Sequence, residues 1–578
     1  MANYTAWKER SIYQVLTDRF AVAGHGNSGP QCDPFAGKHC GGTWRGIIEK
    51  LDYIQGMGFD AVWISPFTKN LDDTTLYGEA YHGYWQDDLY SVNSHFGTTE
   101  DLLALSDALH ARGMFLMVDI IVNHMGSLPD LDFSRLVPFN DASYFHPQQY
   151  ITNYGDQCLV EQGWLGDSKV PLPDLDTENP TVVRTLYAWI NAVVQKFGID
   201  GLRIDAAKHV RKDFWPGFIK SAGVWSVGEV LSGDPGYLGS YQPYVGGLLD
   251  YGTLFSLKRA FKAGIGNMYE LSNLLTSDYR AHFPDVQQMA TFMENHDMAR
   301  FTSDTNADLT VIMNALAWTF LADGIPVLYY GQEQSYTGEN DGDPESRDVL
   351  WRSGYKTTLL YKFISLLNRV RKVSWKAGYG SNLATCLYAE LDVLATQKGP
   401  LIMVLSNQGS QEKDRTISFN TKFSDTTETI LVDLLTNEQI VVKNSLTVTL
   451  VAGQPRLYLP LQLASQVCST TKSPHVSSAS LLVQTLSGMK MSTANVDLDV
   501  SQPAFTWSLG APATTHDILT EPLPLEDGLI LTPAIDAMES PYSIFTGISS
   551  LQVGSEEIDS CRSQTPTSHI LSPLIKVH

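Results

Sequence analysis

Carboxylates stand at or just beyond the carboxyl ends of short apolar runs in this 578-residue sequence. One run ends in Asp205, the next contains Glu229 near its end, and a later one is followed closely by Asp297. Cleavage of an acetal needs two carboxyl groups, one ionised and one protonated. They lie about 5–5.5 Å apart if the configuration is retained and about 6.5–9.5 Å apart if it is inverted. These residues therefore predict glycosidic-bond chemistry, provided that the fold brings the ends of the runs together.

A fixed cation accompanies the first of these carboxylates. Arg203 lies two residues before Asp205, and this spacing on a strand places both side chains on the same face. A neighbouring guanidinium favours the ionised form of a carboxyl group. A single charged residue at a strand end is more often a helix cap or half of an ion pair. Polar residues recur at the ends of the other runs, including Asn123-His124 and His296-Asp297, and this recurrence favours a functional site.

The apolar runs alternate with amphipathic stretches as far as about residue 370. They are rich in β-branched and aromatic residues and span 12–16, 61–65, 114–122, 201–205, 224–230, 288–294 and 326–330. Near-continuous apolar runs are typical of parallel strands that are buried on both faces. We therefore predict a (β/α)8 TIM barrel, an α/β fold, with one further strand near 247–255. A doubly wound open sheet is the alternative. In a barrel, all strand ends face one mouth, where catalytic groups collect.

Helix signals and changes of pattern divide the chain into domains. Thr98–Asp101 resembles a capping box, and Asn179-Pro180 supplies a cap and a first-turn proline. An irregular stretch rich in Asp, Pro and Gly interrupts the barrel, and alternating strands follow it at the C-terminal end. The predicted domains are the barrel (1–124 and 177–374), an inserted subdomain (125–176), a C-terminal antiparallel β-sandwich (375–468) and a Ser/Thr/Pro-rich extension of unknown structure (469–578).

Composition excludes several classes of function. The 43% of hydrophobic residues excludes a disordered chain, and the sequence has no run of about 18 apolar residues that would span a membrane. The formal net charge of −23 disfavours a nucleic-acid partner, whereas a neutral ligand meets no repulsion. The first residues do not read as a signal peptide. Six cysteines are few for this length. These features predict a cytoplasmic protein, and we expect a monomer.

The segments around the polar strand ends resemble the signature regions of the α-amylase family, glycoside hydrolase family 13. They are 118–124 (VDIIVNH), 201–205 (GLRID), 228–230 (GEV) and 292–297 (FMENHD), with 172–176 (LPDLD) similar to a fifth region. Segments 81–85, 201–210, 214–216 and 331–334 resemble the filamentous-fungal α-amylases in particular. The resemblance covers about residues 7–468. Within the fungal enzymes, the sequence is most similar to intracellular homologues. Those homologues are associated with α-glucan synthesis in the cell wall.

The resemblance implies a role for each matched residue. Asp205 matches the nucleophile, Glu229 the general acid/base and Asp297 the transition-state stabiliser of a retaining enzyme. Lys208, His209 and Gly233 match residues on the leaving-group side, and Asp343 with Arg347 matches the pair that grips the glycone. The complete set of implied sugar contacts is His82, Tyr84, Trp85, His124, Arg203, Lys208, His209, Gly233, His296, Asp343 and Arg347.

A calcium ion is also implied by the resemblance. Its ligands match Asn123, Glu161, Asp174 and His209. Asn123 and Asp174 would supply side-chain oxygens, and the positions of Glu161 and His209 contribute largely through backbone carbonyls in the fungal enzymes. An oxygen-only ligand set suits a hard cation such as Ca²⁺. Such an ion would hold the inserted subdomain against the active site.

The sequence departs from the secreted relatives at several positions. Of their disulfides, only the Cys32–Cys40 pair has both partners, and it is the disulfide candidate. Gln149 and Gly163 occupy the positions of a bonded pair, Asn437 replaces the partner of Cys468, and Gly37 replaces a substrate-contacting glutamine. The lost cross-links favour a cytoplasmic location with the other cysteines as thiols. The alternative is a secreted protein whose leader has been removed.

The function predicted by these patterns is retaining endo-hydrolysis of α-1,4-glucosidic bonds in starch- or glycogen-type glucans and maltooligosaccharides. Two alternatives remain. A 4-α-glucanotransferase would use the same residues, with a sugar hydroxyl in place of water. A catalytically silent glucan-binding protein is disfavoured because all three carboxylates are present.

Overall fold

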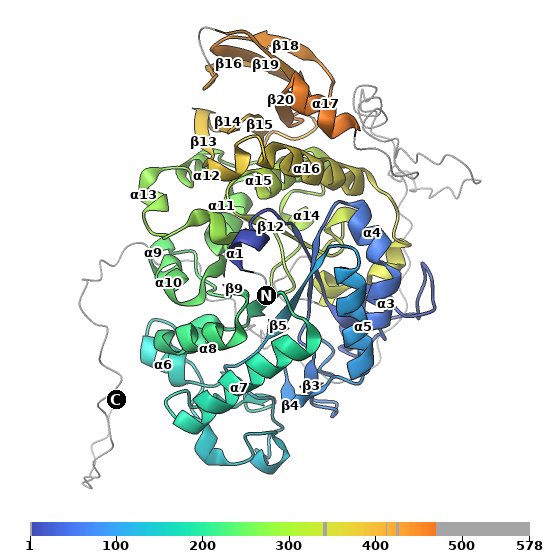
Figure 1. The fold of residues 1–578 in the computed structure, drawn as a ribbon, viewed down its shortest axis with the longest axis vertical. Coiled ribbons are helices and arrows are strands. Elements are labelled where there is room, and N and C mark those ends of the chain that lie inside the picture. The colour runs from blue at the N-terminus through green and yellow to red at the C-terminus, as the bar shows by residue number, and fades with distance from the viewer. Residues whose placement is uncertain (1–2, 339–343, 412, 424–426, 470–578) are drawn as a thin grey trace, which may run out of the picture. The chain divides into compact units, whose positions relative to one another are not determined.

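The computed structural model describes residues 3–338, 344–411, 413–423 and 427–469. Residues 470–578 of the predicted extension lie outside this part of the chain, as does Asp343. A closed barrel of parallel strands is the centre of the fold (Figure 1). Its strands in sequence order are β1 (Ile12–Val15), β2 (Ala61–Ile64), β5 (Phe115–Ile120), β8 (Gly201–Ile204), β9 (Trp225–Gly228), β10 (Gly247–Leu249), β11 (Met289–Thr291) and β12 (Ile325–Tyr329).

The barrel confirms the predicted architecture. β1 closes it by pairing with both β2 and β12, so that Ile12 lies opposite Ala61 on one side and Val327 on the other. This closure excludes the doubly wound open sheet. The further strand predicted near 247–255 is β10, but it is only three residues long. Helix α11 (Tyr251–Ala260) starts directly after it, with Asp250 as its N-cap.

Helices cover the outside of the barrel, as Figure 1 shows for α3, α4, α5, α7 and α8. The capping box at Thr98 is present: the Thr98 hydroxyl accepts from Asp101 N, and the Asp101 carboxylate accepts from Thr98 N. Asn179 caps α7, which Pro180 begins. The main helices are α3 (Trp44–Glu49), α4 (Leu51–Gly56), α5 (Thr99–His110), α7 (Pro180–Phe197), α8 (Trp215–Ala222), α11, α15 (Leu309–Leu321) and α16 (Leu359–Trp375).

Two segments outside the barrel matter for the candidate site. Strands β3 (Thr68–Asn70) and β4 (Gln86–Val92) form a two-stranded sheet, which the sequence patterns did not predict. After β5 the chain forms an irregular region with helix α6 (Gln157–Gln162) and a small hairpin of β6 (Leu165–Gly166) and β7 (Pro171–Leu172). Backbone bridging between His124 and Asp174 joins the far end of this region to the end of β5.

The C-terminal region is antiparallel. Its larger sheet has the order β13-β14-β15-β20-β17-β18, and β16 pairs with β19 in a second sheet. Apolar residues between the sheets, such as Val404, Phe419 and Val448, form one buried cluster. The strands are β13 (Thr385–Ala389), β14 (Val393–Lys398), β15 (Leu401–Ser406), β16 (Arg415–Asn420), β17 (Thr429–Asp433), β18 (Gln439–Val442), β19 (Ser445–Leu450) and β20 (Arg456–Pro460), followed by α17 (Leu461–Ser469).

The cysteine predictions have mixed outcomes. Cys32 and Cys40 form a disulfide with Cα atoms 5.6 Å apart. Cys386 is an exposed free thiol, as expected. Cys158 is disulfide-bonded, so the prediction that it is a thiol is wrong; nothing in its sequence neighbourhood indicated a partner. Among the described helices, none combines the length and the apolar character needed to cross a membrane.

Candidate active site

The site is built around Arg203, whose side chain is fully buried inside the barrel. The register of the sheet places Asp119 on β5 directly beside Arg203 on β8. Arg203 Nη1 lies 2.9 Å from Asp119 Oδ1 and 2.8 Å from Asp205 Oδ1, and Nη2 lies 3.1 Å from Glu229 Oε2. One guanidinium therefore holds three carboxylates that follow or belong to three neighbouring strands.

Backbone geometry fixes the two carboxylates that follow the strands. Asp205 N donates to the carbonyl of Ile120 on β5, and Glu229 N donates to the carbonyl of Ile204 on β8. Ala206 then adopts a left-handed conformation with φ 50°, which is unfavourable for a residue with a Cβ and is typical of functional sites. In this conformation Ala206 N donates to Glu229 Oε2 at 2.9 Å.

Electrostatics at this centre depends on burial and on the single cation. Burial raises the pKa of Asp205 well above its ordinary range, and the nearby Arg203 opposes the rise. Burial raises the pKa of Asp119 to about 6, again against Arg203. The pKa of Arg203 is itself raised because Asp119 and Glu229 outweigh its own desolvation. Because one cation faces three carboxyl groups, the centre favours retention of a proton on one of them.

A chain of hydrogen bonds links this centre to the aromatic residues. Tyr84 donates its hydroxyl to Asp119 Oδ2 at 2.8 Å and also lies 2.8 Å from His296 Nε2. The Tyr84 and His296 rings are stacked, 5.3 Å apart between centroids. Gln14 on β1 lies 2.8 Å from His296 Nδ1. Burial lowers the pKa of His296 well below its ordinary value, so the neutral imidazole is favoured.

Asp297 joins the same group from the segment that follows β11. Its Oδ2 lies 3.1 Å from His296 Nε2, and its Oδ1 lies 3.3 Å from Arg347 Nη2. Arg347 Nε also donates to the His296 carbonyl at 2.8 Å. The structure thus brings together in one connected group Asp205, Glu229, Asp297, Arg203, Tyr84, His296 and Arg347.

The remaining predicted sugar contacts surround this group. His82 stacks on Tyr84 with centroids 5.7 Å apart and meets the Trp85 ring edge-on at 4.6 Å. His124 Nε2 lies 3.2 Å from the Tyr84 carbonyl. Lys208 follows β8 and donates to the Leu231 carbonyl at 3.1 Å. Gly233 packs near Phe255, whose ring is 3.1 Å from the position that a Cβ at 233 would take.

Several residues of the site were not singled out by the sequence patterns. Asp119 belongs to the polar strand end within 118–124, but the sequence patterns assigned it no role in the site. Trp63 donates to Asp119 Oδ2 at 3.2 Å, and Tyr251 O–H lies 3.3 Å from Glu229 Oε1. Gln14 was detectable in principle, because it is a buried polar residue within an otherwise apolar run.

Three oxygen atoms converge at the junction of β5 and the inserted region. The side-chain oxygen of Asn123 lies 3.1 Å from Asp174 Oδ1 and 2.9 Å from the carbonyl oxygen of His209. All three are hydrogen-bond acceptors. A cation bound between the three oxygens would explain this arrangement. Without a cation, the Asn123 side chain would turn so that its amide nitrogen donates to Asp174 Oδ1 and to the His209 carbonyl. The Glu161 carboxylate instead accepts from Gln157 at 2.7 Å.

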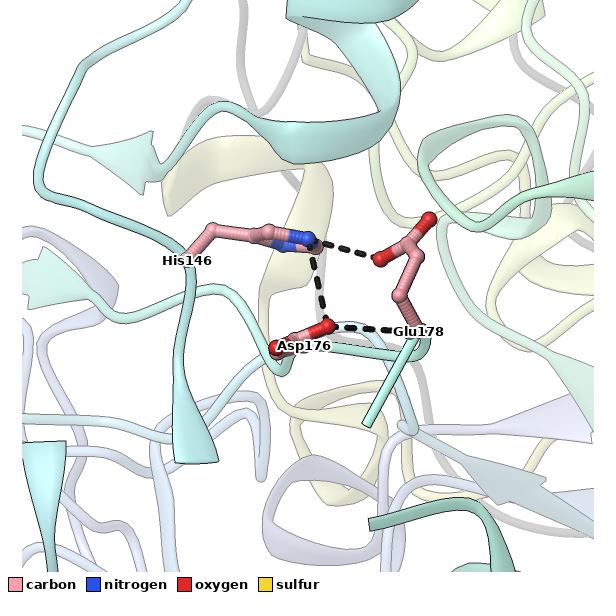
Figure 2. A group of neighbouring side chains, drawn as sticks. All are labelled: His146, Asp176 and Glu178. Atoms are coloured by element: carbon pink, nitrogen blue, oxygen red, sulfur yellow. Dashed lines mark hydrogen bonds and ion pairs between the residues drawn. The ribbon is translucent and has the colours of Figure 1, made fainter. Parts of the chain in front are cut away.

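His146 supports Asp174 from the side away from Asn123. Its Nδ1 lies 2.6 Å from Asp174 Oδ2, and its Nε2 lies 2.8 Å from Glu178 Oε2 and 3.6 Å from Asp176 Oδ1. Figure 2 shows the imidazole facing the Asp176 and Glu178 carboxylates. Burial lowers the pKa of His146, but its hydrogen bonds to Asp174 and Glu178 outweigh this and raise the pKa to about 10. The cluster is thus a set of ion pairs that orients Asp174.

Comparison with known proteins gives the family. The model of the alpha-amylase catalytic domain matches residues 14–385, and that of alpha-amylase domain C matches residues 386–475. This chain belongs to the alpha-amylase family, the glycoside hydrolases of family 13. The chain is 43% identical over 474 residues to an alpha-amylase of Saccharomycopsis fibuligera, an alignment that covers 81% of this chain and 94% of the relative.

Solved structures agree with this assignment. The structure of an alpha-amylase from Malbranchea cinnamomea is 45% identical and superposes with a TM-score of 0.77, covering 80% of this chain and 98% of that one. A cyclomaltodextrin glucanotransferase with a three-domain ABC distribution, CldA, is 27% identical with a TM-score of 0.68, covering 78% and 98%. Hydrolases and transferases thus share this fold.

Loss of Arg203 is expected to destabilise the fold strongly. In Arg203→Met the buried carboxylates lose their cation, and such a loss costs about 3–5 kcal/mol. Urea unfolding followed by fluorescence measures the change in the free energy of unfolding. Arg112→Met is the matched control, because its partner Asp52 is largely exposed and surface pairs contribute little. Equal stability of the two variants would contradict the central role of Arg203.

Proposed function

We propose that this chain is a retaining endo-hydrolase of α-1,4-glucosidic bonds in starch- or glycogen-type glucans and maltooligosaccharides. The observation that supports this most is that Asp205 and Glu229 bind the two ends of one guanidinium. This favours the short separation of carboxyl groups that is typical of retaining enzymes, about 5–5.5 Å. The names of the relatives point to the same bond and substrate class.

Asp205 is the proposed nucleophile. Its Oδ1 is held by Arg203, and none of the described hydrogen bonds involves Oδ2, which is the oxygen that we expect to attack the anomeric carbon. A bond forms from Oδ2 to that carbon as the glycosidic C–O bond breaks, and the electron pair of the broken bond goes to the leaving oxygen. Burial raises the pKa of Asp205, and Arg203 opposes this rise and so favours the ionised form that attack requires.

Glu229 is the proposed acid and base. Ala206 N and Arg203 hold its Oε2, so we expect Oε1, near the Tyr251 hydroxyl, to carry the catalytic proton. It passes to the leaving oxygen in the first step. In the second step Glu229 takes a proton from water, which attacks the anomeric carbon and releases Asp205. Asp297, positioned by His296 and Arg347, stabilises the positive charge that develops on the sugar ring.

The sugar contacts are proposed from the same geometry and from the family resemblance. Tyr84 is the platform under the sugar at the cleavage point, with His82 and Trp85 beside it and His124 and His296 as hydroxyl partners. Lys208, His209 and Gly233 lie on the leaving-group side. Arg347 and Asp343 hold the glycone, although Asp343 lies outside the described residues.

Isosteric replacement of either carboxyl group is expected to abolish turnover. Asp205→Asn and Glu229→Gln each remove one partner of the nucleophile and acid pair, with an expected loss of several orders of magnitude in kcat. The rate at which reducing ends are released from maltoheptaose measures kcat, and circular dichroism checks that each variant is folded. Glu428→Gln, which changes an exposed carboxylate of the C-terminal region, is the control. Substantial activity of Asp205→Asn would contradict the assignment.

The transferase alternative is favoured by one observation, the structural likeness to a cyclomaltodextrin glucanotransferase. In a transferase a sugar hydroxyl would replace water in the second step. The product lengths from maltoheptaose distinguish the two: products longer than the substrate indicate transfer. Binding of maltoheptaose without release of reducing ends or chain rearrangement would instead indicate a silent glucan-binding protein.

We also propose that Asn123, Asp174 and the His209 carbonyl bind Ca²⁺, with Glu161 as a further contributor through its backbone. The convergence of acceptor oxygens supports the site, and hard oxygen ligands suit calcium. When bound, the ion would join the inserted region to the end of β5 and to the segment after β8. His146 orients Asp174 for this role.

Removal of calcium is therefore expected to lower the melting temperature, because a ligand that binds only the folded state stabilises it. Thermal unfolding with and without chelator measures the shift. Asp174→Ala should melt at the temperature of the chelated protein and should not respond to chelator. The exposed Asp213→Ala is the control and should respond like the unaltered chain. An unchanged melting temperature both on chelation and in Asp174→Ala would contradict the calcium site.

A cytoplasmic location is the last part of this proposal. Residues 149 and 163 carry a bonded cysteine pair in the secreted relatives, but here they are Gln149 and Gly163. The Gln149 carbonyl accepts from Trp164 N at 2.7 Å. A backbone hydrogen bond thus joins the segments around residues 149 and 163, which a disulfide would join in the secreted relatives. Cell fractionation with thiol labelling of Cys386 tests the location. Recovery from the culture medium would contradict it.

A further inference from the structure

Gln14 is a buried amide on strand β1, within a run that is otherwise apolar. Its side chain is 2% exposed, and burying an amide costs free energy unless the amide is hydrogen-bonded. Gln14 Nε2 lies 2.8 Å from His296 Nδ1. An amide nitrogen can only donate, so in this orientation Nδ1 accepts and carries no proton. A turned amide would place Oε1 there and would require a proton on Nδ1. The surroundings of the other ring nitrogen decide between the two.

His296 Nε2 faces two hydrogen-bond acceptors. It lies 3.1 Å from Asp297 Oδ2, and an ionised carboxylate can only accept. It also lies 2.8 Å from the Tyr84 hydroxyl, whose single proton is donated to Asp119 Oδ2. The Tyr84 oxygen is therefore an acceptor toward the imidazole. Both contacts require a proton on Nε2.

The direction of the Tyr84 hydrogen bond depends on the ionisation of Asp119. Arg203 Nη1 donates to Asp119 Oδ1 at 2.9 Å, and Trp63 Nε1 donates to Oδ2 at 3.2 Å. Hydrogen bonds from several donors favour the ionised form of a carboxyl group. Because Glu229 is the carboxyl group that we expect to hold the proton of this centre, Asp119 remains an acceptor for Tyr84.

With a proton on Nε2 and none on Nδ1, the His296 ring is neutral. Burial lowers the pKa of His296 well below its ordinary value, two arginines act in the same direction, and Glu229 opposes them. The titratable and charged groups that face the ring are Tyr84, Asp297, Arg203, Arg347, Glu229, His82 and Tyr329. A donor at Nδ1 adds to these effects, because protonation of the ring would set two N–H groups against each other.

The neutral ring matters for the charge of Asp297. An imidazolium would form an ion pair with Asp297 and would reduce the negative charge that faces the sugar ring as this ring becomes positive. The other neutral tautomer would place a bare Nε2 against the Asp297 carboxylate and the Tyr84 oxygen, so that lone pairs would oppose one another. The neutral ring with its proton on Nε2 avoids both effects.

We propose that Gln14 is a positioning residue of the hydrolytic reaction, which fixes His296 as the neutral ring with its proton on Nε2. The hydrogen bond at one ring nitrogen sets the protonation of the other. The hydrogen bonds then run in one direction, from Gln14 through His296 and Tyr84 to Asp119. Gln14 acts through His296 and not on the sugar. This inference rests on the proposed function, in which Asp297 stabilises the charge on the sugar ring.

The tautomer can be measured without turnover. In the full chain labelled with 15N-histidine, solid-state NMR distinguishes protonated from bare ring nitrogens, and His296→Asn identifies the His296 signals by their absence. We expect a bare Nδ1 and a protonated Nε2 at neutral pH. In Gln14→Glu, whose carboxylate can only accept, Nδ1 should carry a proton. A protonated Nδ1 in the unaltered chain, or a bare Nδ1 in Gln14→Glu, would overturn the proposal.

Two variants of nearly equal size separate the donor from the packing. Gln14→Met removes the donor, so kcat on maltoheptaose should fall about tenfold, whereas KM should stay within about twofold because Gln14 does not touch the sugar. Gln14→Glu should in addition raise the pKa of His296, so that the ring stays protonated to a higher pH. The acid limb of its kcat profile should therefore lie at higher pH than that of Gln14→Met. Circular dichroism checks that each variant is folded.

Asn368→Leu is the matched control. Asn368 is a buried amide on α16 that donates to the Met57 carbonyl at 2.8 Å, outside the barrel mouth, and its loss should leave kcat and the pH profile unchanged. An acid limb of Gln14→Glu that coincides with that of Gln14→Met, or an equal loss of kcat in Asn368→Leu, would overturn the proposal. Failure of the unaltered chain to release reducing ends would instead overturn the proposed function, while the ring tautomer would still decide what Gln14 does to His296.

Discussion

A single buried guanidinium is the constraint on which the active centre depends. Arg203 cannot lose its charge, and it is fully buried within the barrel, so the fold must supply carboxylates around it. It does so from three strand ends, with Asp119, Asp205 and Glu229 all within 3.1 Å of its terminal nitrogens. Because one cation cannot balance three anions in a buried site, the arrangement favours one protonated carboxyl group beside an ionised one, as a retaining glycosidase requires.

The barrel supplies the rigidity that this arrangement needs. Parallel register sets Asp119 beside Arg203, and backbone hydrogen bonds from Asp205 and Glu229 anchor the first residues beyond β8 and β9. The aromatic layer of Tyr84 and His296 is bonded to the same centre through Asp119. A displacement of any one of these strands would therefore change the electrostatics and the shape of the sugar platform together.

Segments outside the barrel adapt this centre to its substrate. The inserted region returns to the end of β5 through Asp174, where the oxygens of Asn123 and His209 converge. Its hairpin also reaches the turn between β3 and β4, where the Tyr77 hydroxyl donates to Asp167 Oδ2. The inserted region thus contacts both the proposed calcium site and this turn.

The sequence by itself determined the barrel and the positions of nearly all its strands, because apolar periodicity is a local signal. It also drew attention to Asp205, Glu229 and Asp297 at or after strand ends, whereas the roles proposed for them come from the family resemblance. It located β10 only approximately, since three residues followed at once by a helix carry almost no periodicity. The tertiary structure alone decided that Asp119 shares Arg203 with Asp205 and Glu229 and that Gln14 reaches His296. These contacts join residues as far as 282 positions apart, and only the closure and register of the barrel bring such side chains together.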